Sequence, residues 1–410
     1  MGAVVETVIF HVDVNSAFLS WSAVEALKRD PDSVDLRTIP SAVGGDKATR
    51  HGIITARSIP AKKYHVTTGE PVVKALEKCP DLVLVPGDYG AYSRHSHELM
   101  DHLRKYAPVV QQYSIDEAFC DFTGTKKLYG DPVSFAHKLK DEIYETYGFS
   151  VNVGISSNKL LAKMASDFEK PNRVHTLYPE EVPGKMWPLP VGDLFSVGKS
   201  TAARLHALGI HTIGKLAHTD ESILVAQFKS FGHVLYEYAN GRSSSDFAAR
   251  DKDTKNKSYS NEITISHDVT NTEEAHLILL SLAESVGSRL RRDGFKVSVV
   301  QAYYKDAGFA VHSKQLTLDA PTDSTQKLYE TGVELFDLLW QEEPIRLMGL
   351  SGARAESGEL EQLNFFDMEK SEKRKKLDTA IDEVRNRFGA EAITRASLLD
   401  QTDRKRLSRK

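Results

Sequence analysis

The order of apolar segments in the N-terminal part of the chain constrains the fold more than any other feature of the sequence. Runs of β-branched and aromatic residues such as TVIFHVD predict buried strands, and residues 132–147 have the i, i+4 apolar spacing of an amphipathic helix. Strands are expected at residues 7–13, twice within 109–122 and at 149–156; helices are expected at 16–28, 91–105, 132–147 and 157–168. With residues 19–77 set aside as an insertion, the order becomes β-α-β-β-α-β, which is typical of a ferredoxin-like α+β domain.

The residue pattern differs in the rest of the chain. Residues 187–240 predict short helices, and the polar segment 242–257 predicts a linker. Residues 258–353 predict strand, helix, strand, strand, helix and strand, which indicates a second small α+β domain. Residues 354–410 are expected to form a charged tail.

The composition excludes several classes of protein. The 410 residues, 27% of them charged, are those of an ordinary globular chain. Two cysteines, Cys79 and Cys120, cannot form a disulfide framework and indicate a reducing cytoplasm. No apolar run is long enough to span a membrane, and the opening residues lead directly into a strand, so no signal peptide is expected. A net charge of −4 does not suggest a nucleic-acid partner, so local features must indicate one.

Three carboxylates lie at the ends of predicted apolar strands. Asp13 ends the first strand, and Asp116 and Glu117 lie where the second and third strands meet. The first and third strands of this fold are neighbours, so the three acids can converge at one edge. Oxygen ligands favour Mg²⁺ or Mn²⁺, and two such ions ~4 Å apart can activate one oxygen and stabilise another. The alternative is that the acids are turn and surface residues, but a solvated acid is costly within apolar strands.

Six segments of the chain form an informative set when they are taken in order. They are FHVDVNSAF (10–18), YSIDEAF (113–119), VGISSNKLLAKMASDFEKPN (153–172), SVGKSTAARLHALGI (196–210), KSYSNEITI (257–265) and QLNFF (362–366). Together they resemble the Y-family DNA polymerases of the DinB/UmuC type. The resemblance implies a right-hand polymerase with a ferredoxin-like palm, small fingers, a helical thumb and an α+β little finger. The implied bounds are palm 1–18 and 78–170, fingers 19–77, thumb 171–241, linker 242–257, little finger 258–353 and tail 354–410.

The resemblance also implies roles for residues around the nucleotide. Asp13, Asp116 and Glu117 match the catalytic acids, which bind two Mg²⁺ ions for which Mn²⁺ can substitute, and the carbonyl of Val14 matches a further ligand. Phe18 matches the residue that excludes ribonucleotides by its shape; the alternative is an ordinary core residue.

Two lysines are expected to bind the triphosphate of the nucleotide. Lys170 matches the lysine of the family's KPN segment, and Lys62 lies in the fingers. Many DinB members have Tyr and Arg where this chain has Ile59 and Lys62, whereas UmuC-like members also use Lys at the second position. This departure leaves the choice between the DinB and UmuC subfamilies open.

Primer-template DNA is the expected macromolecular partner. Gly198, Lys199 and Ser200 lie in a helix-hairpin-helix pattern whose NH groups can bind a phosphate, although a plain helical hairpin fits the spacing equally well. The segment 257–353 has nine Lys/Arg and fourteen Asp/Glu residues, a net charge of −5. Its sheet is expected to face DNA through strand cations, which are Lys296, Lys305, His312 and Lys314.

The tail contains a predicted peptide for a sliding clamp. Its residues are Gln362, Leu363, Phe365 and Phe366. The alternative is that this Phe-Phe pair folds back onto the preceding domain.

The resulting prediction is a monomeric, cytoplasmic polymerase that carries out template-directed, error-prone translesion synthesis from dNTPs without proofreading. One alternative is a UmuC-like catalytic subunit that needs protein activators. A palm-type nucleotide cyclase shares the fold order and the acids but needs neither the hairpin nor the clamp peptide. A third alternative is a non-catalytic DNA- or clamp-binding protein with a decayed palm, but the intact acids argue against decay.

Overall fold

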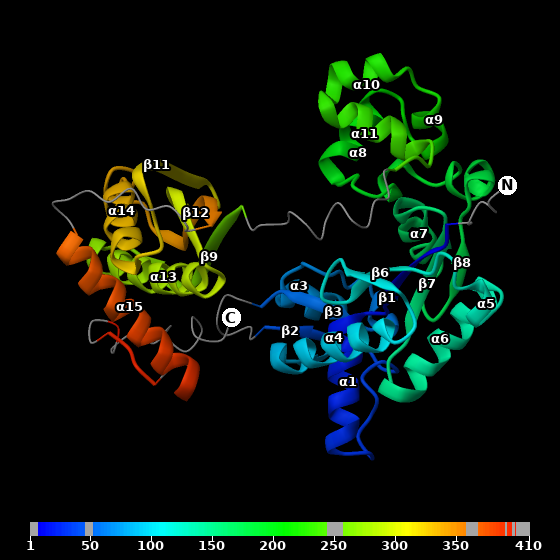
Figure 1. The fold of residues 1–410 in the computed structure, drawn as a ribbon, viewed down its shortest axis with the longest axis horizontal. Helices are drawn as coiled ribbons and strands as arrows, with labels where there is room; N and C mark the ends of the chain where they lie inside the picture. The colour runs from blue at the N-terminus through cyan, green and yellow to red at the C-terminus, as the bar shows by residue number, and fades with distance from the viewer. Residues whose placement is uncertain are drawn as a thin grey trace. The chain divides into compact units, whose positions relative to one another are not determined.

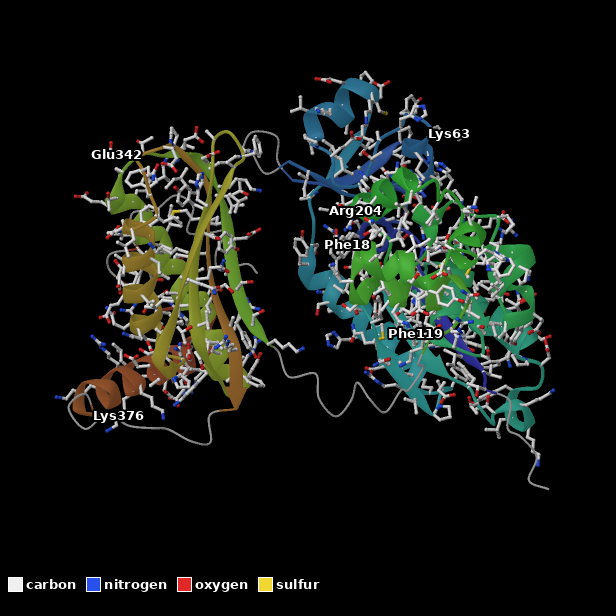
Figure 2. All side chains as sticks on the ribbon, turned by 90° about the horizontal axis from the view of Figure 1, so that it is seen from above. Phe18, Lys63, Phe119, Arg204, Glu342 and Lys376 are labelled. Carbon is white, nitrogen blue, oxygen red and sulfur yellow. The ribbon has the colours of Figure 1, made fainter. Side chains whose placement is uncertain are left out.

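The computed structural model describes residues 7–45, 52–243, 257–357, 368–389, 392–395 and 398. They divide into two compact units, the first ending at residue 243 and the second beginning at residue 257 (Figure 1). Most of the predicted linker lies outside the described residues. Figure 2 shows the side chains of both units and labels Phe18 and Arg204 in the first, and Glu342 and Lys376 in the second.

A five-stranded sheet forms the centre of the first unit. Its strands are β1 (Ile9–Val14), β5 (Val109–Gln112), β6 (Glu117–Asp121), β7 (Val151–Ser156) and β8 (Val174–Thr176), in the order β5-β6-β1-β7-β8. β1 pairs antiparallel with both β6 and β7. The predicted ferredoxin-like order is therefore confirmed, and β8 extends it by one parallel strand beside β7.

Helices cover both faces of this sheet. They are α4 (Tyr89–Arg104), α5 (Lys126–Tyr129), α6 (Pro132–Tyr147) and α7 (Lys159–Ser166). Alternate residues of β1, Phe10, Val12 and Val14, pack in the core formed with α4 and α6. The residues between them point to the opposite face, where Ile9 packs with Ala162 of α7. The strand period of two therefore directs His11 and Asp13 toward α7.

α7 approaches β7 closely because of one glycine. A Cβ atom at Gly154 would lie 2.0 Å from the carbonyl oxygen of Ala162 and 2.4 Å from the amide nitrogen of Ser166. Only a residue without a side chain permits this contact between backbones. The close approach brings the polar side chains of α7 over the ends of β1 and β6.

The first unit also contains a small sheet and a helical segment. The small sheet has the order β3-β2-β4 and comprises β2 (Ser41–Gly44), β3 (Ile54–Arg57) and β4 (Val83–Val85), with helices α1 (Ala17–Arg29), α2 (Ile59–Lys62) and α3 (Val72–Lys78). The helical segment comprises η2 (Pro179–Glu181), η3 (Val182–Met186), η4 (Val191–Asp193), α8 (Lys199–Ala207), α9 (Ile213–Ala217), α10 (Glu221–Phe228) and α11 (Ser230–Ala239). This segment has its own apolar core, to which α7 contributes Leu160, Leu161, Met164 and Ala165.

The second unit is a four-stranded antiparallel sheet packed on helices. Its elements are β9 (Ser258–Val269), α13 (Thr272–Asp293), β10 (Phe295–Asp306), β11 (Val311–Thr322), α14 (Thr325–Asp337), β12 (Ile345–Ser357) and α15 (Met368–Phe388), with the strand order β11-β10-β12-β9. One core joins the sheet to α13 and α14. The element order agrees with the prediction for residues 258–353.

The segment that was expected to be a tail differs from the prediction. β12 extends to Ser357, four residues past the expected end of the domain, and α15 lies within residues 354–410. The expectation of a tail arose because this segment is highly charged and lacks a strong apolar period. Ion pairs link α15 to other helices of the second unit.

The ion pairs of α15 reach two other helices of the second unit. Arg291 of α13 donates to Asp382 at 2.6 Å, and Glu284 of α13 accepts from Arg385 at 3.0 Å. Asp378 is buried and accepts the backbone N–H of Thr325, the first residue of α14, at 3.1 Å. This carboxylate therefore satisfies one of the unpaired N–H groups at the start of α14.

Among the described residues, no helix combines the length and apolar composition needed to cross a lipid bilayer.

Candidate active site

The structure brings the three predicted acids together at the end of β1 and β6. Asp13 and Glu117 are direct cross-strand partners, and only 5% of Asp13 is exposed. Asp116 precedes β6, and its carbonyl oxygen accepts the N–H of Val14 at 3.1 Å. The side chains of Asp13, Asp116 and Glu117 line one cavity.

Lys163 of α7 lies among these acids. Its Nζ is 3.1 Å from Asp13 Oδ2, 3.1 Å from Glu117 Oε2 and 3.1 Å from Asp167 Oδ2. Burial alone would lower the pKa of Lys163, but the surrounding carboxylates raise it above its usual value. The ammonium group therefore stays charged and offsets repulsion among the acids.

A second lysine contacts the same site from the turn after α7. Lys170 Nζ lies 3.1 Å from Asp13 Oδ2 and 2.8 Å from Asp167 Oδ1. Asp167 thus bridges the two lysines on the side away from Asp13. Lys163 and Lys170 thus pair with Asp13, Glu117 and Asp167, whereas no ion pair to Asp116 is found among the described residues.

The carboxyls of Asp116 and Glu117 differ in their electrostatic surroundings. Burial raises the pKa of Asp116, the hydroxyl of Ser114 opposes this shift, and the charges of Asp13 and Glu117 add to it. Burial would also raise the pKa of Glu117, but hydrogen bonding to His11 and the charge of Lys163 lower it to about 2. Unlike Glu117, Asp116 therefore has no neighbouring cation that offsets the effect of burial.

His11 connects Glu117 to α7. Its ring is fully buried, with Nε2 3.1 Å from Glu117 Oε2 and Nδ1 2.8 Å from the hydroxyl of Ser166. Because a carboxylate only accepts hydrogen bonds, the Nε2 that faces it carries the hydrogen. Burial lowers the pKa of His11 more than its carboxylate neighbours raise it. The neutral ring therefore orients Glu117.

The residues of this site fit a divalent cation of the hard type. The ligand atoms that lie within 4.8 Å of one another come from His11, Asp13 and Glu117, and Asp116 lines the same cavity. Carboxylate oxygens are the donors that such an ion prefers.

The cavity beside the acids has a volume of about 550 Å³ and three kinds of lining. Its lining includes the acids, the ring of Phe18 and a group of basic residues. The basic residues are Arg57, Lys62, Lys163 and Lys170. Burial lowers the pKa of Lys62, and the charges of Arg57 and Lys170 lower it further. Mutual repulsion of these cations favours the binding of a polyanion next to the acids.

Aromatic neighbours hold Phe18 in place. Its ring stacks on Tyr92 with a centroid distance of 4.6 Å and an interplanar angle of 10°. Tyr92 is buried, and its hydroxyl is 2.7 Å from that of Ser22. The ring of Phe18 is therefore a fixed wall of the cavity.

The remaining predicted site residues lie elsewhere. Gly198, Lys199 and Ser200 are exposed at the start of α8. The clamp peptide, which comprises Gln362, Leu363, Phe365 and Phe366, lies outside the described residues.

The predicted cationic face of the second sheet is not present as expected. Lys296 is buried, and His312 stacks on the buried ring of Tyr304 at 4.8 Å. Lys314 pairs with Ala302, whose side chain belongs to the helix-covered core. Cross-strand partners share a face, but β11 is an edge strand, where Lys314 is exposed and His312 is partly exposed. The prediction was wrong for Lys296, because it took strand membership alone as a sign of exposure; for Lys314 and His312 it stays a prediction.

Sequence reasoning missed several residues of the site. They are His11, Arg57, Asn152, Lys163 and Asp167. The i, i+4 spacing of Lys163 and Asp167 was a usable signal for an ion pair on one helix face. The alternation of β1, which directs His11 to the same face as Asp13, was another.

Comparison with family models gives three matches along the chain. The impB/mucB/samB family matches residues 12–167, its C-terminal domain matches residues 256–365, and the IMS family HHH motif matches residues 179–210. The first match contains all three acids, and the third contains the start of α8.

Curated proteins resemble the chain over nearly its full length. It is 43% identical to DNA polymerase IV of Clostridium acetobutylicum, over 97% of this chain and 99% of that protein. It is 35% identical to DNA polymerase IV of Alkaliphilus oremlandii, over 96% and 99%, and 34% identical to DNA polymerase IV 2 of Bacillus subtilis, over 96% and 95%. A solved structure, the Y-family DNA polymerase chimera Dbh-Dpo4(243-245)-Dbh, matches with a TM-score of 0.70 and 22% identity, over 84% of this chain and 98% of that one; this supports the fold.

The role of Lys163 as a counter-ion predicts a metal-dependent stability. Replacing Lys163 by Met leaves buried carboxylates without their ammonium partner, which costs about 3 kcal/mol or more in free energy of unfolding. In the presence of a chelator, we expect Lys163→Met to have a lower thermal midpoint than the unaltered chain. Millimolar Mg²⁺ should raise the midpoint of the variant more than it raises that of the unaltered chain.

Lys140→Met is the matched control. Lys140 is also buried, but its Nζ contacts the exposed Asp141 and the side chain of Asn172 instead of an acid of the cavity. Its loss of stability should not respond to Mg²⁺. Equal recovery in both variants, or none in either, would contradict the role of Lys163.

Proposed function

The chain belongs to the Y-family DNA polymerases of the DinB type, and we propose that Asp13, Asp116 and Glu117 bind two Mg²⁺ ions at its active site. It is a DNA-directed DNA polymerase that carries out translesion synthesis on a DNA template. The observation that carries the proposal is that three acids and four basic residues line one cavity.

The acids determine where the reaction occurs. When bound, the two ions would lower the pKa of the primer 3′-hydroxyl and stabilise the charge on the leaving pyrophosphate. Asp13 and Glu117 are fixed by strand pairing, and Asp116 by the bond from Val14 N–H to its carbonyl. The backbone carbonyl of Val14 is a further proposed ligand. Mn²⁺ can substitute for Mg²⁺ because it prefers the same oxygen donors.

Phe18 is the proposed barrier to ribonucleotides. It lines the cavity directly beside the acids, and its stacked partner Tyr92 prevents the ring from turning away. A fixed ring beneath the sugar leaves space for a hydrogen atom at C2′ but not for a hydroxyl. Selection for deoxynucleotides then follows from shape alone.

The cationic side of the cavity is the proposed triphosphate site. Lys62 and Lys170 provide point charges for phosphate oxygens, and Arg57 adds a third cation to this wall. These residues come from the small sheet, α2 and the turn after α7, so nucleotide binding would bring together the proposed fingers and palm.

The proposed domain bounds follow the sequence prediction with one change. We assign palm 1–18 and 78–170, fingers 19–77, thumb 171–241, linker 242–257 and a little finger from residue 258 that includes all of β12 and α15, except that β4, which pairs with β2, belongs with the fingers. Gly198, Lys199 and Ser200, at the exposed start of α8, are proposed contacts for a DNA phosphate. The small fingers and the predicted lack of proofreading would make synthesis error-prone. The monomeric state and cytoplasmic location stay predictions.

Replacement of Asp116 tests the proposed metal site. Asp116→Ala should lower the rate of single-nucleotide incorporation by roughly 10³-fold or more, because the acid stabilises charge in the transition state. Binding of primer-template DNA, measured by fluorescence anisotropy, should change little. Asp121→Asn, on the same strand, is the matched control and should retain activity. Substantial incorporation by Asp116→Ala with Mg²⁺ present would argue against the assignment.

Truncation of Phe18 tests the barrier to ribonucleotides. Phe18→Ala opens space beside C2′ without altering a proposed metal ligand. The ratio of dNTP to rNTP efficiency should fall by about tenfold or more, which corresponds to about 1.4 kcal/mol. Tyr92→Phe, which keeps the stacked ring, should preserve the ratio. An unchanged ratio in Phe18→Ala would assign Phe18 to the core.

Replacement of the two phenylalanines of the clamp peptide tests whether this peptide binds a sliding clamp. Phe365→Ala combined with Phe366→Ala should leave single-nucleotide insertion nearly unchanged and remove the clamp's stimulation of long synthesis. The reason is that tethering raises local concentration without new contacts at the active site. A double variant that unfolds or loses basal activity would instead support the alternative that the Phe-Phe pair folds back.

A further inference from the structure

We propose that Asn152 is a positioning residue that holds Lys170 in place for the triphosphate. This inference rests on the proposed function of Lys170 and adds a residue that acts through it. Asn152 lies in β7, directly opposite Asp13 of β1. It is completely buried, and its side chain reaches the turn that carries Lys170.

The amide of Asn152 uses its full hydrogen-bonding capacity. Its Nδ2 donates to the carbonyl oxygens of Ser166, at 3.0 Å, and Glu169, at 2.7 Å. Its Oδ1 accepts from the backbone N–H of Arg173, at 3.1 Å, and from Nδ2 of Asn15, at 3.1 Å. An amide has two donors and two acceptor lone pairs, and all four are occupied.

These bonds fix both ends of the turn that contains Lys170. Glu169 is the residue before Lys170, and Arg173 lies three residues after it. Asn15 adds a further contact, because its Oδ1 accepts the backbone N–H of Asn172 at 2.8 Å. These side chains attach the turn to β7 and to the end of β1, in addition to the backbone bond from the N–H of Val153 to the carbonyl of Arg173 and the bond from Lys140 to Asn172.

The attachment matters because a lysine side chain has many rotamers. Lys170 Nζ lies 3.1 Å from Asp13 Oδ2, and it keeps this position only while the backbone of the turn stays in place beside the end of β1. A shift of the turn would move the ammonium group away from the cavity without altering Asp13, Asp116 or Glu117. The loss should therefore appear in nucleotide capture rather than in the chemical step.

No other side chain of similar size matches this set of partners. A carboxylate at position 152 would place oxygens against the carbonyls of Ser166 and Glu169, which also only accept hydrogen bonds. A hydroxyl is shorter and has a single donor. Removal of the amide would leave buried carbonyl and amide groups of the turn without partners, which favours rearrangement of the turn.

The test is a double-variant cycle on steady-state incorporation by the full chain. Asn152→Ala should raise the KM for dNTP by about tenfold, with kcat within about twofold of its starting value. Lys170→Ala should raise the KM on its own, and adding Asn152→Ala to it should produce little further change. Asn152→Ser, which replaces the amide by a hydroxyl, should give an intermediate KM. It is the test variant if Asn152→Ala fails to fold.

Ser156→Ala is the matched control. Ser156 is a buried residue of the same strand, and its hydroxyl donates to the carbonyl of Leu177. It should lower the thermal midpoint without a change in the KM for dNTP. An effect of the Asn152 variants that is limited to stability, or one that adds fully to that of Lys170→Ala, overturns the inference.

The outcomes separate this inference from the proposed function. If Lys170→Ala raises the KM and the Asn152 variants do not, only the positioning role of Asn152 fails. If Lys170→Ala leaves the KM unchanged, the triphosphate role of Lys170 fails, and the inference fails with it.

Discussion

Repulsion among buried carboxylates is the constraint on which the architecture of the first unit depends. Asp13 and Glu117 face each other across two central strands, with Asp116 beside them. Such a group can remain ionised in a protein interior only if cations lie next to it. Lys163 provides one, and it can do so because α7 packs directly on β7 at Gly154. The helix, the glycine and the acids are therefore one structural unit, although they lie far apart in the sequence.

The sequence allowed much of this to be predicted, since strand alternation and helix period are local properties. The ferredoxin-like order and the meeting of Asp13 with Glu117 follow from such patterns once the strands are paired. Alternation places His11 on the same face as Asp13, but the partners of His11 and Asn152 could not be assigned in this way. Each is polar in an otherwise apolar strand, and its function depends on which α7 or turn atom lies above it. That information is tertiary and arises only when α7 is in place.

In the second unit, reasoning from the local sequence led to the wrong expectation for a charged segment. α15 has a highly charged sequence, which was the reason to expect a tail. Its attachment depends on matched partners such as Arg291 and Asp382, which are 91 residues apart. Charge alone does not distinguish a solvated helix from one held by ion pairs, because the distinction lies in the partner. Among the strand cations, Lys296 is buried, and His312 contacts the ring of Tyr304 and the carboxylate of Asp306 although it is partly exposed.

Competition for one oxygen atom links the two halves of the active site. Asp13 Oδ2 is 3.1 Å from both Lys163 and Lys170, and it is also an atom that a divalent ion would bind. A cation at Asp13 therefore weakens the hold of that carboxylate on Lys170, while Asp167 retains its bond at 2.8 Å. By reciprocity, an anion that draws Lys170 from Asp13 makes the carboxylate more available to a cation. Binding of the triphosphate and binding of the metal then favour each other. The buried amide of Asn152 matters for this coupling because it limits Lys170 to movements of its side chain.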